Sequence, residues 1–264
     1  MSVVTDTMSV VTALACMTLS DWGQHGTAMA PQSARIREWL GEEPYLFATA
    51  SMKQYKDRAS LDRSIVDHIA APPTKLSVVE IQRLDELLPH DVALQRAITV
   101  LRPNEEEDCD LVAELVHDGR LQKLFVMVHH EKYAIRVWLD AMGALNLHAG
   151  VAAERVNPVL LAAAEAIQRE EYNGLKSGRG KDAIVQLVRA FAAHGHPADP
   201  ELWARAYFAV GGSFRHAATI SELVSEVRRG VRHRVKPAYR DDVYDVLLAQ
   251  SAEEGESEAR SDGR

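Results

Sequence analysis

The chain has 264 residues, of which 47% are hydrophobic and 26% charged, and its formal net charge is −8 at pH 7. This length allows one large or two small domains, and the composition excludes a disordered or fibrous protein. No stretch offers the ~20 consecutive apolar residues that span a bilayer, so we expect no membrane association. The two cysteines, Cys16 and Cys109, match neither a disulfide framework nor a metal-ligand spacing, which indicates a reducing compartment.

The N-terminal segment lacks the features of an export signal. A secretory signal starts with a positively charged region, whereas the first Lys or Arg of this chain is Arg35. Residues 1–5 recur as residues 8–12, and Met8 is a candidate alternative start. We therefore expect a cytoplasmic protein whose residues 1–33 form an irregular N-terminus. On this interpretation the first 20 residues are dispensable.

Residues 34–103 are interpreted as an N-terminal helical region. Ser77 and Glu80 have the spacing of a capping box, and apolar residues follow them at helical intervals. Asp91 is expected to cap the next helix, which carries an apolar face as far as Leu101 and ends before Pro103.

Two short apolar runs do not reveal their secondary structure. Pro44–Ala50 is compatible with a short strand or with the end of a helix. Leu124–Val128 is continuously apolar, which fits a buried strand and a helix segment equally well.

Residues 104–250 are interpreted as a C-terminal helical region. Asn157-Pro158 and Asp199-Pro200 each combine a capping residue with a proline, a typical helix start. The charged residues 251–264 are expected to form a disordered acidic tail. The fold class predicted from these patterns is mainly α, a multi-helix bundle or short irregular helical stack with at most one or two short strands.

Positive charge is concentrated near the C-terminus. Residues 213–240 hold seven Lys or Arg against two Glu, a charge of +5, so the remainder of the chain carries −13. After Gly230, Arg232, Arg234 and Lys236 alternate with other residues, which places three cations on one side of an extended arm and suits a phosphate backbone. The predicted anion-binding residues of this arm are Arg228, Arg229, Arg232, Arg234, Lys236 and Arg240. The alternatives are a solvated face and pairing with the acidic run 105–110.

A glycine-rich loop before a helix forms a second candidate anion site. Three cations, Lys176, Arg179 and Lys181, lie among the glycines of residues 174–180. Free backbone amides at a helix start and nearby cations favour an anion. The loop is not a Walker A motif, because Asp182 stands where Ser or Thr holds Mg²⁺. The alternative is a flexible connection between helices.

A metal-dependent phosphohydrolase of the HD type is the enzymatic alternative. In it, His90, His117 and Asp118 would hold a metal ion that activates water. A simpler explanation exists for His117, which suits the C-terminal end of a helix dipole. No G-x-S-x-G motif is present to indicate nucleophilic catalysis.

The sequence therefore predicts a cytoplasmic α-helical binding protein whose basic C-terminal arm contacts DNA, RNA or another polyanion. We expect no cofactor and no bound metal, and we do not favour an enzyme. Besides the phosphohydrolase, the alternative is a protein-interaction module whose basic arm meets an acidic protein or a second copy of the chain.

Overall fold

A computed structural model of the chain describes residues 12–23, 29–42, 45–70, 77–88, 96–103 and 105–261. It contains two compact units. The first, here called the α/β unit, comprises residues 1–139 and 143–153. The second, the helical unit, comprises residues 140–142 and 154–264. The boundary between these units lies near residue 153, whereas the sequence suggested one near residue 103.

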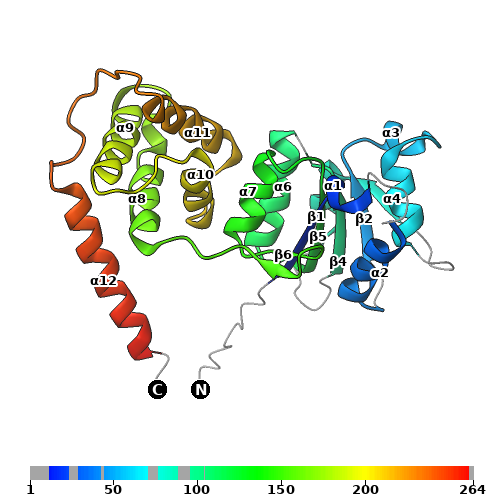
Figure 1. The fold of residues 1–264 in the computed structure, drawn as a ribbon. Helices are drawn as coiled ribbons and strands as arrows, with labels where there is room; N and C mark the ends of the chain where they lie inside the picture. Colours follow the sequence, from blue (N-terminus) through cyan, green and yellow to red (C-terminus); the bar gives the residue numbers. More distant parts are fainter. Residues whose placement is uncertain are drawn as a thin grey trace, which may run out of the picture. The chain divides into compact units, whose positions relative to one another are not determined.

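The α/β unit is built on a seven-stranded sheet with the order β3-β2-β4-β5-β1-β6-β7 (Figure 1). All neighbouring strands are parallel except β6 and β7, which are antiparallel. The prediction of a mainly α bundle is therefore wrong, and the fold class is α/β. The strands are β1 Ala13–Thr18, β2 Tyr45–Thr49, β3 Val78–Glu80, β4 Arg96–Leu101, β5 Leu121–Val128, β6 Leu145–Asn146 and β7 Val151–Ala152.

Strand β1 lies inside the sheet, although the sequence predicts an irregular segment there. It pairs with β5 along its whole length, from Ala13 opposite Lys123 to Thr18 opposite Val128, and with β6 on its other side. Ala15 and Met17 are fully buried and Cys16 is 3% exposed. We therefore expect β1 to be needed for folding, unlike the dispensable N-terminus predicted from the sequence, because the strand joins β5 to β6.

Strand β4 occupies the position of an expected helix. It pairs with β2 and β5, and Ile98 and Val100 are fully buried. A parallel strand covered on both faces is apolar at nearly every position, so helical spacing appears in it by coincidence. For the same reason, the apolar run at residues 124–128 could not be assigned from the sequence; it is part of the strand β5. The other ambiguous run contains the strand β2.

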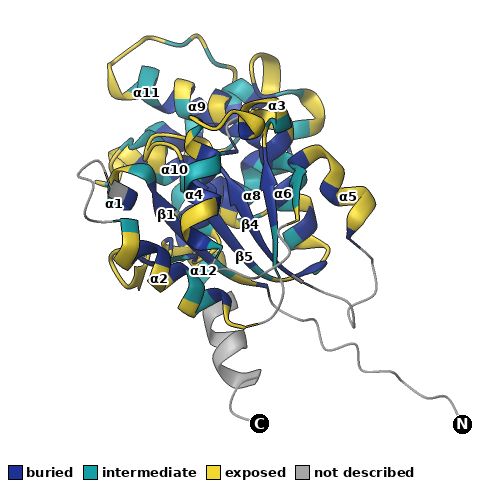
Figure 2. Ribbon diagram, turned by 90° about the vertical axis from the view of Figure 1, so that its right-hand side faces the viewer, coloured by how far each residue is buried: buried dark blue, intermediate teal, exposed yellow. Residues whose placement is uncertain are grey.

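The helices of the α/β unit cover both faces of this sheet. Helices α2 and α4 lie on one face, and α6 and α7 lie on the other (Figure 1). The strands between them are buried (Figure 2). The bounds are α1 Leu19–Gly23, α2 Met29–Leu40, α3 Met52–Lys56, α4 Leu61–Ile69, the 3₁₀ turn η1 Ile81–Arg83, α5 Leu84–Leu87, α6 Glu106–His117 and α7 Ala134–Ala141.

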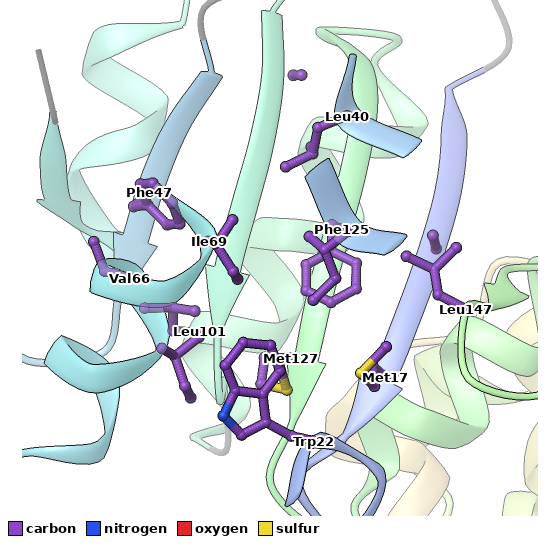
Figure 3. Packing of buried hydrophobic residues seen from close by; sticks show 14 of the residues in the cluster. Met17, Trp22, Leu40, Phe47, Val66, Ile69, Leu101, Phe125, Met127 and Leu147 are labelled. Carbon is purple, nitrogen blue, oxygen red and sulfur yellow. The ribbon is translucent and has the colours of Figure 1, made fainter. Parts of the chain in front are cut away.

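The core under α2 and α4 draws on segments far apart in the sequence. Met17 of β1, Phe47 of β2 and Phe125 of β5 pack there against Leu40 and Trp22 (Figure 3). These five side chains are at most 2% exposed. The carboxyl ends of the parallel strands are therefore fixed next to one another at one edge of the sheet.

The helical unit follows the local signals of its sequence. Asn157 and Asp199 cap α8 and α10 as predicted, accepting hydrogen bonds from the amides of Val159 (2.9 Å) and Glu201 (3.0 Å). Its core includes Phe191 and Trp203, whose rings meet edge to face at 5.3 Å. The elements are α8 Pro158–Gln168, the 3₁₀ turn η3 Glu171–Asn173, α9 Gly178–Ala193, α10 Pro200–Ala209, α11 Phe214–Arg228 and α12 Val243–Ser261.

Helix α12 continues beyond Gln250, where the sequence predicts its end. It runs to Ser261, so residues 251–261 of the expected disordered tail are helical. None of the helices in the described ranges combines the length and the apolar character that a membrane span requires.

Candidate functional site

The predicted basic arm follows α11 and includes the end of that helix. We call residues 228–236 the basic segment; Figure 1 shows it in orange, leading from α11 toward α12. Residues 231–237 have no regular secondary structure. The side chains at 232, 234 and 236 are exposed, whereas those at 233 and 235 are partly buried. The alternation read from the sequence thus corresponds to an alternation of exposure.

The cations of this segment differ in their partners. Within the described part of the chain, no ion pair involves Arg228, Arg229, Arg232, Arg234 or Lys236. Arg240 differs, because its guanidinium lies 2.8 Å from the carboxylate of Asp242. Among the described residues, five of the six predicted cations therefore have no ion-pair partner.

Helix α9 bonds the backbone within the basic segment and just after it. The Gln186 side chain accepts hydrogen bonds from the amides of Ala238 (2.9 Å) and Tyr239 (3.0 Å) and donates one to the Tyr239 carbonyl (2.7 Å). The His233 side chain is 5% exposed, and its Nε2 lies 3.4 Å from a carboxylate oxygen of Glu226. These contacts hold the backbone just after the exposed cations and the side chain that lies between Arg232 and Arg234.

Tyr239 belongs to this anchorage. Its hydroxyl donates to the carbonyl of Ala166 in α8 at 3.3 Å. Burial raises the pKa of Tyr239, with the Glu170 carboxylate adding to the shift. The Tyr239 ring is thus held by its hydroxyl and is partly buried.

The three cations of the glycine-rich loop separate in the structure. Arg179 lies 2.8 Å from Glu170, and that hydrogen bond raises the pKa of its guanidinium. Lys176 instead lines a pocket of about 240 Å³ together with Arg215 and His216 of α11. Lys181 is not among the residues that line it. Of the three, Lys176 alone reaches this pocket.

Behind the pocket, a hydrogen-bonded group joins η3 to the start of α11. The Tyr207 hydroxyl donates to one carboxylate oxygen of Glu171, and the other oxygen lies 3.6 Å from Nδ1 of His216. Burial raises the pKa of Tyr207, and the hydrogen bond to Glu171 adds to this shift. Ser213 Oγ lies 3.3 Å from the same Nδ1. The contacts at Nδ1 therefore set the orientation of the His216 imidazole ring.

The metal-site alternative gains no support from the geometry. His117 ends α6 and Asp118 follows as its C-cap, and both are exposed. His90 lies outside the described residues. The part of the chain that is described contains no group of three His, Cys, Asp or Glu side chains arranged to hold a metal ion. The helical fold that favoured this alternative is also replaced by an α/β sheet.

The structure brings together a group at the carboxyl edge of the sheet that the sequence did not indicate. The Nε2 atom of Gln32, in α2, lies 2.8 Å from Nδ1 of His148. On the other side of the ring, His148 Nε2 lies 3.9 Å from a carboxylate oxygen of Asp21. Because an amide nitrogen only donates, Gln32 places the proton of a neutral His148 on Nε2. Thr18 at the end of β1 donates to Asp21 at 2.7 Å.

A second pocket, of about 480 Å³, opens beside His148 between α2 and β6. Its volume lies within the range of roughly 300–1,000 Å³ that is common for small-molecule sites. Arg35, Glu38 and Trp39 of α2 line it with Leu145 and Leu147. Sequence spacing does not suggest this pocket, because α2 and β6 are separated by about a hundred residues.

An ion pair with a buried carboxylate lies at the carboxyl ends of β2 and β4. Asp62 of α4 accepts hydrogen bonds from Thr49 at the end of β2 (2.8 Å) and from Nε of Arg102 (2.6 Å). Arg102 has φ +52°, in the left-handed region. Helices α4 and α6 cover opposite faces here, as at the ligand-binding crevice of many open α/β sheets. The pair fixes the shape of this edge.

Cys109 is expected to resist alkylation in the folded protein. Burial raises the pKa of its thiol to about 12, and the neighbouring Asp108 and Asp110 carboxylates add to the effect. At pH 8 only roughly one molecule in 10⁴ then carries the reactive thiolate. Iodoacetamide labelling followed by peptide mass spectrometry should find Cys109 unmodified without denaturant and modified in 6 M guanidinium chloride. Rapid native labelling would contradict the buried placement.

No protein-family model, curated protein or solved structure matches this chain.

Proposed function

We propose that the helical unit binds a polyanion, with nucleic acid as the expected class, through the basic segment. The observation that carries the proposal is the row of exposed cations at 232, 234 and 236, which have no ion-pair partner among the described residues. An extended backbone places alternate side chains about 6–7 Å apart. This is close to the spacing of successive phosphates along an extended single strand, so one row of cations can follow one strand.

The anchorage of the segment also supports this function. Gln186 bonds the backbone just after the cations, and Arg189 donates to the carbonyl of His233 at 3.4 Å. A segment held in its binding conformation loses less conformational entropy when the partner arrives. The exposed side chains, rather than the backbone, are then the groups that become ordered.

The charge distribution of the chain predicts how binding should depend on salt concentration and on base sequence. The basic region 213–240 has a charge of +5 within a chain that otherwise carries −13. Nucleic acid is repelled by a net-acidic protein at long range, so contact must depend on a local cationic surface. Binding should therefore be strongly salt-dependent and nearly independent of base sequence.

We expect binding to duplex DNA to depend on the logarithm of salt concentration with a slope of about −4.5, if all five cations meet phosphates at ~0.9 counterions each. Replacing Arg232, Arg234 and Lys236 with Ala should flatten this slope by nearly three. The loss of affinity should be similar on unrelated sequences. Fluorescence anisotropy with labelled DNA and RNA from 20 to about 200 mM salt measures both quantities.

A matched control removes three cations from the α/β unit. Lys53, Lys56 and Arg58 are exposed, and their replacement by Ala changes the net charge by the same amount. This variant should retain the steep slope. Absence of binding at low salt, or equal losses in the two triple variants, would refute the role of the basic segment. Loss of dimerisation in the first variant would instead assign the segment to a second copy or an acidic protein.

A further inference from the structure

The starts of α9 and α11 face a common pocket in the helical unit. Gly174, Lys176 and Ser177 line it from the loop before α9, and Arg215, His216 and Thr219 line it from the first two turns of α11. These segments are about forty residues apart in the chain. The pocket lies at the end of α11 opposite the basic segment, about 22 Å away for a helix of 15 residues.

Both helices begin without a side-chain cap. Ser177 and Ser213 stand at the N-cap positions, and neither side chain hydrogen-bonds a backbone amide of its helix. In the same unit, α8 and α10 are capped by Asn157 and Asp199. The dipoles of both helices favour a negative group near their first turns.

The side chains of the pocket have matching chemistry. Lys176 and Arg215 have no ion-pair partner among the described residues, and no carboxylate lines the pocket. Thr219 is 4% exposed, and within the described ranges its hydroxyl has no hydrogen-bond partner. An unbonded hydroxyl in a buried side chain is costly unless a ligand or water satisfies it.

Gly180 fixes the loop that carries Lys176. A Cβ at this position would lie 2.2 Å from the carbonyl oxygen of Gly174, which is a backbone atom with little freedom to retreat. The close approach of α9 to its own preceding loop therefore requires glycine. The loop is built into this conformation, which is unlike the flexible connection considered from the sequence.

We propose that this pocket binds a phosphate group, either as the free dianion or as the terminal group of a phosphate monoester. Two cations, the positive ends of two helix dipoles and two hydroxyls match the charge and the acceptor oxygens of phosphate. The volume of about 240 Å³ is below that of pockets for drug-sized ligands, which suits a small terminal group. The site uses residues separate from the basic segment, so either can exist without the other.

The test is a titration of the full chain with inorganic phosphate, methyl phosphate and dimethyl phosphate. Isothermal titration calorimetry gives the affinity, and backbone amide NMR shifts locate the site. We expect saturable binding of phosphate, methyl phosphate or both, with shifts concentrated at residues 177–180 and 213–216. Dimethyl phosphate, a monoanionic diester, should bind at least tenfold more weakly. Preference between the first two probes identifies the free anion or the monoester as the ligand.

Single substitutions test the contacts. Lys176→Ala and Arg215→Ala should each weaken phosphate binding about tenfold or more, as the loss of a charge-assisted hydrogen bond does. Thr219→Val keeps the shape of the side chain and should weaken binding by about two- to tenfold. Lys176 and Arg215 are exposed, so their removal should not disturb folding.

Two control variants distinguish a direct contact with phosphate from the general electrostatic effect of removing one cation. Lys181→Ala removes a cation from the first turn of α9, and Arg169→Ala removes an exposed one at the C-cap of α8. Both should bind phosphate as the unchanged protein does. The proposal is overturned if the full chain binds neither probe, if the shifts lie elsewhere, or if Lys181→Ala loses as much affinity as Lys176→Ala.

Discussion

Deletion of residues 1–18 should unfold the α/β unit. The deletion removes β1, which pairs with β5 on one side and with β6 on the other. It exposes the unpaired edges of both neighbours and leaves a gap beside Phe125 in the core. A domain is stable by only about 5–15 kcal/mol, and the loss of a central strand exceeds that. The deletion variant should lose NMR dispersion in this unit and be digested rapidly there by protease.

A second truncation serves as the control for this result. A chain that starts at Met8 lacks the first copy of the repeated segment and keeps every residue of β1. It should show the same thermal transition and the same protease resistance as the full chain. A native-like α/β unit in the deletion of residues 1–18 would show that the described sheet does not need β1.

Arg102→Ala should lower the free energy of unfolding of the α/β unit by about 3–5 kcal/mol, because it leaves the buried Asp62 carboxylate without its charged partner. The Asp62 side chain is 3% exposed, and without Arg102 its remaining side-chain donor among the described residues is Thr49. Burying a carboxylate with so little compensation is expensive. Urea denaturation followed by circular dichroism measures the change in the first transition.

The control for Arg102 is an arginine in an exposed pair. Arg63 and Asp67 lie 3.1 Å apart in α4, and their side chains are 43% and 50% exposed. Arg63→Ala should cost no more than about 0.5 kcal/mol, as for other exposed helical pairs. Adding Asp62→Ala to Arg102→Ala should recover part of the lost stability, because no unpaired charge is then buried. Equal effects of Arg102→Ala and Arg63→Ala would contradict the buried placement of the first pair.

Local chemistry was enough to predict much of the helical unit. Asn157-Pro158 and Asp199-Pro200 start helices because the cap and the proline act on adjacent backbone groups. The alternation at 232, 234 and 236 was also readable, because successive side chains of an extended segment point to opposite sides. Each of these features depends on residues within a few positions of one another.

The sheet and the sites at its edge were decided by tertiary structure. Strands β1 and β4 are short apolar segments whose partners lie far along the chain, and their burial on both faces removes the alternation that marks a strand. His148 likewise meets Gln32 across 116 residues. Such pairings leave no local trace in the sequence.

The proposed phosphate pocket depends both on the local sequence and on tertiary packing. The sequence by itself determined a glycine-rich, cationic helix start at residues 174–181. The packing of α11 against α9 decided which cation matters, since it brings Arg215 and Thr219 to Lys176 while Glu170 takes Arg179. The start of a helix can be recognised in the sequence. The side chains that complete a binding site come from the element that packs against it. Which element packs there depends on the burial of apolar surface over the whole unit.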